Sequence, residues 1–183
     1  VKLSYNRNAQ YIHLLSNTAA SIPLDIWTPS NPNINPQISN QVAGGYFRNF
    51  KQNTYETSVE LFYKTMQNQL DFIPYVNLLN NVKREGEILS GLGRAYGAEF
   101  YVKKAKGKLT GWISYTLSRT ERKVEGLSQN DWFPSRFDKT HNINLVGIYK
   151  IKERMSFSVN SMYGSGTPMT LGNQVFNYDG VGG

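Results

Sequence analysis

The sequence predicts an all-β protein, an antiparallel up-and-down transmembrane β-barrel segment with long external loops and short periplasmic turns. Three observations predict it: apolar and polar residues alternate with a period of two, the alternating runs are long, and short and long connections follow each other. Runs of about ten residues exceed the ~5–6 of an average strand and match the ~9–11 that cross a tilted bilayer. Outer-membrane barrels place tight turns at one end and long loops at the other.

The clearest alternation lies in the hairpin of residues 93–123, whose two runs meet at Lys106 and Gly107. Tyr96, Phe100 and the apolar residues between them share one face of the first run, and Ile113 and neighbouring apolar residues share one face of the second. The opposite positions are mostly polar or small. A sheet with one apolar and one polar face follows from this spacing.

The remaining runs extend the same pattern. In residues 55–73, Glu60 and Lys64 stand four apart as in a helix, but the apolar spacing of two and the β-branched and aromatic residues favour a strand. We therefore expect about seven strands, with a polar turn at 51–54 and a charged turn at 150–154. The other expected strands are 1–16, 41–50, 139–151 and 154–163, and the expected long loops are 17–40, 74–92 and 124–138.

The composition suits a wall that is wet on one side and apolar on the other. The chain has 183 residues, of which 39% are hydrophobic, 18% charged and 13% aromatic, and it has no cysteine. No stretch approaches the ~18 apolar residues of a transmembrane helix. The net charge of +7 comes from scattered lysines and arginines, which favours solvated turns over one binding patch, with contact to lipopolysaccharide phosphates as the sharper alternative.

Tyrosines mark the borders of the apolar face. An aromatic ring with a polar tip suits a membrane interface, and five tyrosines are expected on the outer face. The alternative is a β-sandwich, which the length of the strands disfavours. The five are Tyr63, Tyr96, Tyr115, Tyr149 and Tyr163.

Three aromatic residues in the expected loops are candidate ligand-binding residues. Trp27 belongs to loop 17–40, and Trp132 and Phe133 belong to loop 124–138. Aromatic faces stack on sugars and peptides, so these side chains could hold a solute. The alternative, which we weigh more heavily for the second loop, is that such residues pack the loop onto its own barrel.

Arg136, Asp138 and His141 could suggest acid–base or metal chemistry, but we expect them to form a structural loop base, with Arg136 and Asp138 as an ion pair. His13 and His141 have no metal-ligand spacing between them. No phosphate-binding loop or nucleophile motif is present either. The sequence therefore predicts no catalytic residue, no metal, no cofactor and no enzyme, and it lacks the motif of an aromatic RNA-binding sheet, so no nucleic-acid partner is expected.

Several runs, in their order and spacing, make the chain resemble the C-terminal barrel portion of TonB-dependent outer-membrane receptors, of the type with an N-terminal carboxypeptidase-regulatory-like domain. The resemblance covers nearly the whole chain, and no single run carries it alone. The runs are residues 23–27, 36–41, 45–48, 61–64, 93–99, 109–118, 133–142 and 164–170.

The resemblance implies a large plugged barrel in the outer membrane of a Gram-negative bacterium, importing a scarce solute such as an iron chelate, cobalamin, a peptide or a glycan. Its implied partners are outer-membrane lipid and lipopolysaccharide, the TonB complex acting through an N-terminal part, a possible surface lipoprotein, and the solute. Signal peptide, TonB box and plug are missing, and the strand count is odd, so we expect residues 1–183 to be a partial barrel. A passive porin or adhesin barrel and a soluble binding module remain alternatives.

Overall fold

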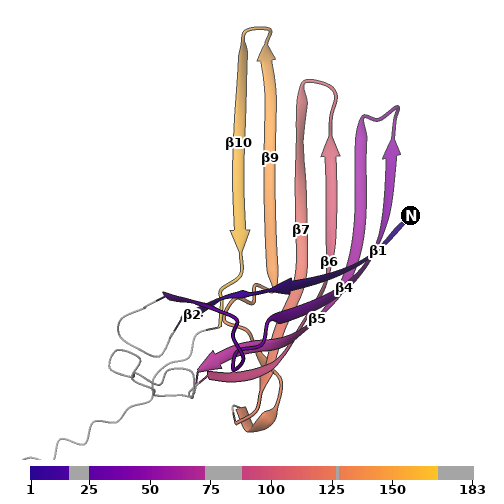
Figure 1. The fold of residues 1–183 in the computed structure, drawn as a ribbon. Coiled ribbons are helices and arrows are strands. Elements are labelled where there is room, and N and C mark those ends of the chain that lie inside the picture. The colour runs from indigo at the N-terminus through magenta and orange to yellow at the C-terminus, as the bar shows by residue number, and fades with distance from the viewer. Residues whose placement is uncertain (17–24, 73–87, 127, 169–183) are drawn as a thin grey trace, which may run out of the picture.

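The computed structural model describes residues 1–16, 25–72, 88–126 and 128–168, and it is all-β, as predicted (Figure 1). One antiparallel sheet of eight strands dominates the described residues, beside a separate two-stranded sheet. The strands of the large sheet are β1 (Lys2–Gln10), β4 (Gln37–Phe50), β5 (Tyr55–Phe72), β6 (Ile88–Lys104), β7 (Leu109–Val124), β8 (Phe133–Pro134), β9 (His141–Lys152) and β10 (Met155–Gly164). The small sheet pairs β2 (Ile12–Ser16) with β3 (Asp25–Pro29).

The large sheet is an up-and-down arrangement. Its strand order is β1-β4-β5-β6-β7-β9-β10, and the two-residue strand β8 pairs with β7 beyond the point where β9 begins. The predicted count of about seven strands corresponds to these long strands. Within the described residues the sheet is open, because β1 and β10 each pair with a single neighbour.

The two ends of the sheet differ as predicted. Short turns join β4 to β5, β6 to β7 and β9 to β10, and in Figure 1 all three lie at the top. Lys51, Gln52 and Asn53 adopt positive φ angles in the first turn, and Gly107 does so in the second with φ 103°. The longer connections lie at the opposite end, which we call the loop end.

The predicted loops include residues that belong to strands in the structure. β3 lies inside the predicted loop 17–40, and β4 begins at Gln37, directly after Pro36. A proline without an N–H group is tolerated before a strand or at a sheet edge, so the prolines bound strands here instead of excluding them. β6 begins at Ile88 inside the predicted loop 74–92, and loop 124–138 holds β8 and a 3₁₀ turn at Ser128–Asn130. Residues 17–24 and 73–87 of these loops lie outside the described residues.

The predicted strand 1–16 is two strands. β1 ends at Gln10 and pairs with β4, whereas β2 begins at Ile12 and pairs with β3. In the sequence, the alternation of apolar and polar residues weakens after Ala9, close to this change of partner.

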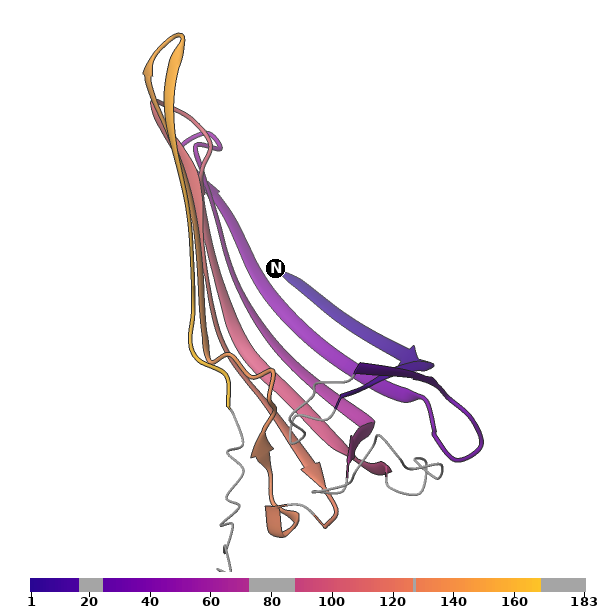
Figure 2. The same ribbon diagram turned by 90° about the vertical axis from the view of Figure 1, so that its left-hand side faces the viewer.

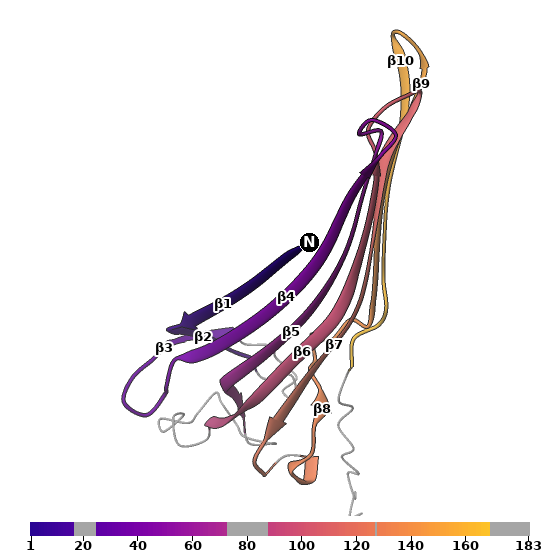
Figure 3. The same ribbon diagram turned by 90° about the vertical axis from the view of Figure 1, so that its right-hand side faces the viewer.

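The sheet is strongly bent, as Figures 2 and 3 show. Side chains diverge on the convex side of a bent sheet and converge on the concave side. In β5, Val59, Leu61 and Tyr63 are exposed, whereas Ser58 and Glu60 on the opposite face are only half-exposed. The apolar face is therefore the convex one, and the polar face is concave.

Glycines in β6 let its two neighbours meet on the concave face at the loop end. A Cβ on Gly93 would lie 3.0 Å from Met66 and 3.2 Å from Gln69 of β5, and one on Gly91 would lie 2.7 Å from Val124 of β7. Val124 is fully buried there. The loop end thus has a small core. Among the described residues, no helix is long and apolar enough to cross a membrane.

Candidate functional site

The convex face is a continuous apolar surface. The pairing register gathers one set of apolar residues from every long strand on the same side, and most of them are exposed, as Leu61 of β5 is at 61%. Soluble monomers rarely expose an apolar patch of this extent. The face comprises Leu3, Tyr5, Val42, Tyr46, Val59, Leu61, Tyr63, Tyr96, Phe100, Val102, Leu109, Ile113, Tyr115, Leu117, Ile143, Leu145, Tyr149, Phe157, Val159 and Tyr163.

Aromatic rings border this surface. The register puts all five predicted tyrosines on the convex face, which confirms their common side. Tyr55 and Tyr63 in β5 are eight residues apart, about 26 Å along the strand at ~3.3 Å per residue. The rings of Tyr63 and Tyr96 stack across β5 and β6 at 6.4 Å. The apolar surface therefore has a defined width of a size comparable to the ~25 Å apolar band of membrane barrels.

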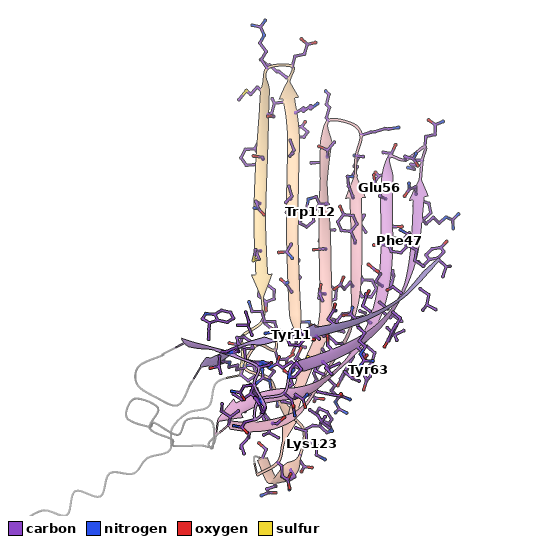
Figure 4. The ribbon with its side chains drawn as sticks, in the orientation of Figure 1. Tyr11, Phe47, Glu56, Tyr63, Trp112 and Lys123 are labelled. Carbon is purple, nitrogen blue, oxygen red and sulfur yellow. The ribbon has the colours of Figure 1, made fainter. Side chains whose placement is uncertain are left out.

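The concave face carries most of the polar and charged residues of the long strands, although Phe47, Phe62 and Trp112 also lie on it. Lys103 of β6 pairs with Glu56 of β5 at 3.2 Å, and Glu60 lies directly opposite Glu99 in the register. Figure 4 shows Glu56, Phe47 and Trp112, which belong to this face, in the half of the sheet nearer the tight turns. The charged residues Glu56, Glu60, Lys64 and Glu99 all share this face. Other polar members are Ser4, Asn6, Gln41, Ser58, Ser114, Thr116, Asn142, Asn144, Ser156, Ser158 and Asn160.

A charged cluster lies on the convex face at the loop end, beyond the apolar surface. The buried carboxylate of Glu121 accepts a hydrogen bond from Nε of Arg94 at 2.7 Å on one oxygen and from Nε of Arg119 at 2.8 Å on the other. Burial opposes ionisation of Glu121, but the hydrogen bonds and charges of the two arginines outweigh it and lower its pKa below the ordinary value. We call Arg94, Arg119 and Glu121 the arginine clamp.

The arginine clamp holds the following loop against the sheet. The guanidinium of Arg94 lies 4.2 Å from the ring centre of Trp132, a cation–π contact. The sequence analysis missed the clamp, although its signal was present. Arg94, Arg119 and Glu121 fall in phase with the apolar residues of β6 and β7, at positions where the alternation predicts apolar side chains.

The three candidate ligand residues do not gather at one place. Trp132 packs on Arg94, and Phe133 belongs to β8, whose backbone pairs with β7 at Arg122. Both therefore fit the alternative that the loop packs onto its own sheet. Trp27 lies in β3, on the two-stranded sheet, and is 65% exposed. Trp27 is thus the candidate most available to a ligand.

The predicted loop-base residues support the connection from β7 to β9. Asp138 is buried and accepts a hydrogen bond from the backbone N–H of Thr120 at 2.7 Å. The guanidinium of Arg136 lies 4.5 Å from the ring centre of Phe137, and the Arg136–Asp138 ion pair stays a prediction. His141 begins β9, where its ring stacks on Tyr115 and its Nδ1 lies 2.9 Å from the hydroxyl of Tyr115.

His13 of β2 is a buried residue whose packing was not predicted from the sequence. It is almost completely buried, its Nε2 lies 2.8 Å from Oγ of Ser30, and its Nδ1 has no described hydrogen-bond partner. Burial lowers the pKa of His13, so the neutral imidazole is favoured. β2 also contacts β5, so the small sheet to which His13 belongs lies against the large sheet.

Among residues 1–16, 25–72, 88–126 and 128–168, no group of three or more His, Asp and Glu side chains could hold a metal ion. Comparison of the chain with protein-family models, with curated proteins and with solved structures finds no match. The geometry of the two faces and of the loop end therefore carries the functional argument.

Proposed function

We propose that this chain forms part of the wall of an outer-membrane β-barrel of the TonB-dependent transporter type, in a Gram-negative bacterium. The observation that carries the proposal is the pairing of an exposed apolar convex face, bordered by tyrosines, with a polar concave face on the same long strands. An apolar face of this width is stable against hydrocarbon, and a polar inner face is stable against water or a polar plug.

The strand length supports a membrane wall over a soluble sandwich. β5 has 18 residues and β6 has 17, whereas the part of a strand that crosses a bilayer needs only ~9–11. The strands therefore project beyond the apolar surface at the loop end. Projecting strands that carry charged residues such as the arginine clamp are expected where the wall leaves the hydrocarbon.

In this proposal each part of the chain has one task. The convex face contacts lipid, and Glu56, Glu60, Lys64 and Glu99 form hydrogen bonds with a plug inside the barrel. The loops at the other end bind a scarce solute outside the cell, with Trp27 as the most exposed aromatic candidate. Force from the TonB complex, acting on the plug, then opens the path for the solute.

Two measurements on the full-length protein that contains this chain, extracted from outer membranes in detergent, test the proposal. A folded barrel should migrate differently in denaturing electrophoresis before and after boiling, and it should bind the isolated periplasmic domain of TonB. Heat-dependent migration without TonB binding would favour a passive porin or adhesin barrel. A protein that stays soluble without detergent would contradict the membrane assignment altogether.

A further inference from the structure

The arginine clamp has features that holding a loop in place does not require. Trp132 contacts Arg94, and Pro134 pairs with the backbone of Glu121, whereas the side chain of Arg119 makes no described hydrogen bond or ring contact with that loop. Arg119 contacts Glu121 and remains half-exposed, with 49% of its side chain accessible. Packing of the loop therefore does not explain why the charged side chain of Arg119 lies at the surface.

Glu121 orients both arginines. Nε and Nη2 of Arg94 lie 2.7 Å from one carboxylate oxygen, and Nε of Arg119 lies 2.8 Å from the other. The described residues give no hydrogen bond to Nη1 of Arg94 or to the Nη atoms of Arg119. Two guanidinium groups fixed by a shared carboxylate present donors in a geometry that suits the oxygens of a phosphate group.

The clamp lies at the level where a lipid headgroup would be. Arg119 is directly opposite Tyr96 in the register, and Arg94 is two residues from Tyr96 in β6. Tyr96 belongs to the aromatic border of the apolar surface. Exposed Lys123 continues the same face two residues beyond Glu121, and Figure 4 shows it near the loop end of the sheet.

The charge balance also favours an anion. Two arginines and one lysine lie near two carboxylates, those of Glu121 and of Asp138, whose charge also acts on Arg119. A net positive charge therefore remains beside an apolar surface that would hold acyl chains. Basic residues next to a membrane surface attract anionic headgroups. A soluble anion would gain only the electrostatic contact, whereas a phosphorylated lipid would also place its chains against the apolar face.

We infer that Arg94, Arg119 and Lys123 form a binding site for the phosphate group of an outer-leaflet lipid, with Glu121 and Trp132 as positioning residues. This inference rests on the proposed membrane function. It adds a specific lipid contact to one position of the wall, at the loop end of β6 and β7.

The test compares lipid retention by native mass spectrometry of the detergent-extracted protein, titrated with lipid A that carries two phosphates. Arg119→Gln should weaken binding about tenfold, the loss expected for one charge-assisted contact. Arg48→Gln is the matched control, because Arg48 also lies on the convex face over an aromatic ring, 4.8 Å from the centre of Phe50, but near the tight turns. It should leave lipid A binding unchanged.

Three results would overturn the inference. The first is equal binding of lipid A by the wild type and by Arg119→Gln. The second is that the wild type binds a lipid A analogue without phosphates as tightly as lipid A itself. The third is displacement of lipid A by millimolar inorganic phosphate, which would indicate a soluble-anion site. Heat-dependent migration is checked for every variant. If Arg119→Gln does not fold, Lys123→Gln replaces it, with a loss of binding still expected.

The same experiment separates the inference from the proposed function. A protein that shows heat-dependent migration but no preference for phosphorylated lipid contradicts the inference alone. A protein that shows no heat-dependent migration and needs no detergent contradicts both.

Discussion

The convex and concave faces of the sheet are made by the same strands, yet they differ in chemistry along most of their length. In β5, Val59 and Leu61 point to the convex side, and Ser58 and Glu60 point to the concave side. The backbone hydrogen bonds are common to both faces. The side chains alone therefore determine whether each face is stable against water or against hydrocarbon. Substitutions at neighbouring residues should then change the free energy of unfolding by unequal amounts.

The largest difference is expected for a charge placed on each face in turn. Val59→Arg should lower the free energy of unfolding in phospholipid vesicles by about 2–4 kcal/mol, because Val59 lies midway between Tyr55 and Tyr63 and arginine on the lipid side near mid-bilayer is costly. Glu60→Arg, one residue away on the concave side, should cost less than about 1 kcal/mol, since it also relieves the like-charge pair with Glu99. Urea unfolding followed by tryptophan fluorescence measures both. Equal costs would remove the distinction between the faces.

The next comparison sets the buried carboxylate of the clamp against an exposed one. Glu121→Gln should reduce stability by about 1.5–3 kcal/mol, because it weakens two charge-assisted hydrogen bonds to a buried group. Glu56→Gln, which affects the half-exposed pair with Lys103, should cost about 0–1 kcal/mol. The same urea titration at pH 7 compares the two variants.

The clamp also predicts a pH dependence of stability. The folded pKa of Glu121 lies below its ordinary value of 4.5, so its contribution is present above that pH and is lost as the pH falls through the folded pKa. Glu121→Gln should lack this part of the acid-induced loss. A wild type and variant with parallel pH profiles between about pH 5 and pH 3 would contradict the assignment.

Two glycines that face each other across β7 and β9 give a smaller contrast. A Cβ on Gly111 would collide with the backbone carbonyl of Val146, and its φ of 149° already strains a side chain, whereas a Cβ on Gly147 would meet nothing within 4 Å. Gly111→Ala should cost about 1–3 kcal/mol. Gly147→Ala should be neutral or stabilising by up to about 1 kcal/mol. Thermal unfolding in vesicles would reveal whether the order is reversed.

The smallest effect is expected at the small sheet. Burial lowers the pKa of His13, so stability there is present above the ordinary histidine value of 6.5 and falls as the pH drops below it. Amide hydrogen exchange of Ile12 and Thr28 should therefore lose protection by up to about tenfold per pH unit relative to the amides of β5. In His13→Gln this extra loss should disappear, and its persistence would assign the effect to another group.

The alternation of residue types was sufficient to predict the long strands, the two faces and the tight turns, but not the short strands β2, β3 and β8. Tyr63 and Tyr96 share a face because the side-chain period of a strand is two, and this needs no long-range information. The ends of the strands were harder. Ile88 and Gln37 extend β6 and β4 into predicted loops because a neighbouring strand continues to offer hydrogen bonds there, which depends on the register and not on the local sequence.

The clamp and the buried histidine show the limit of a local prediction. Arg94 and Glu121 are 27 residues apart and meet only because β6 and β7 pair in one register. His13 is buried because β2 leaves β1 and pairs with β3, a change of partner that no alternation within residues 1–16 specifies. Trp132 packs on Arg94, a partner that the local sequence around residue 132 does not indicate.

The most direct measurement is a fluorescence scan of single cysteines along β5, which the absence of native cysteine makes clean. Probes placed by Ser58→Cys, Val59→Cys, Glu60→Cys and Leu61→Cys would be exposed in vesicles to brominated lipid and, separately, to aqueous iodide. We expect brominated lipid to quench positions 59 and 61 and iodide to quench 58 and 60. Iodide quenching at all four positions, with none by brominated lipid, would contradict the assignment of the convex face to the membrane.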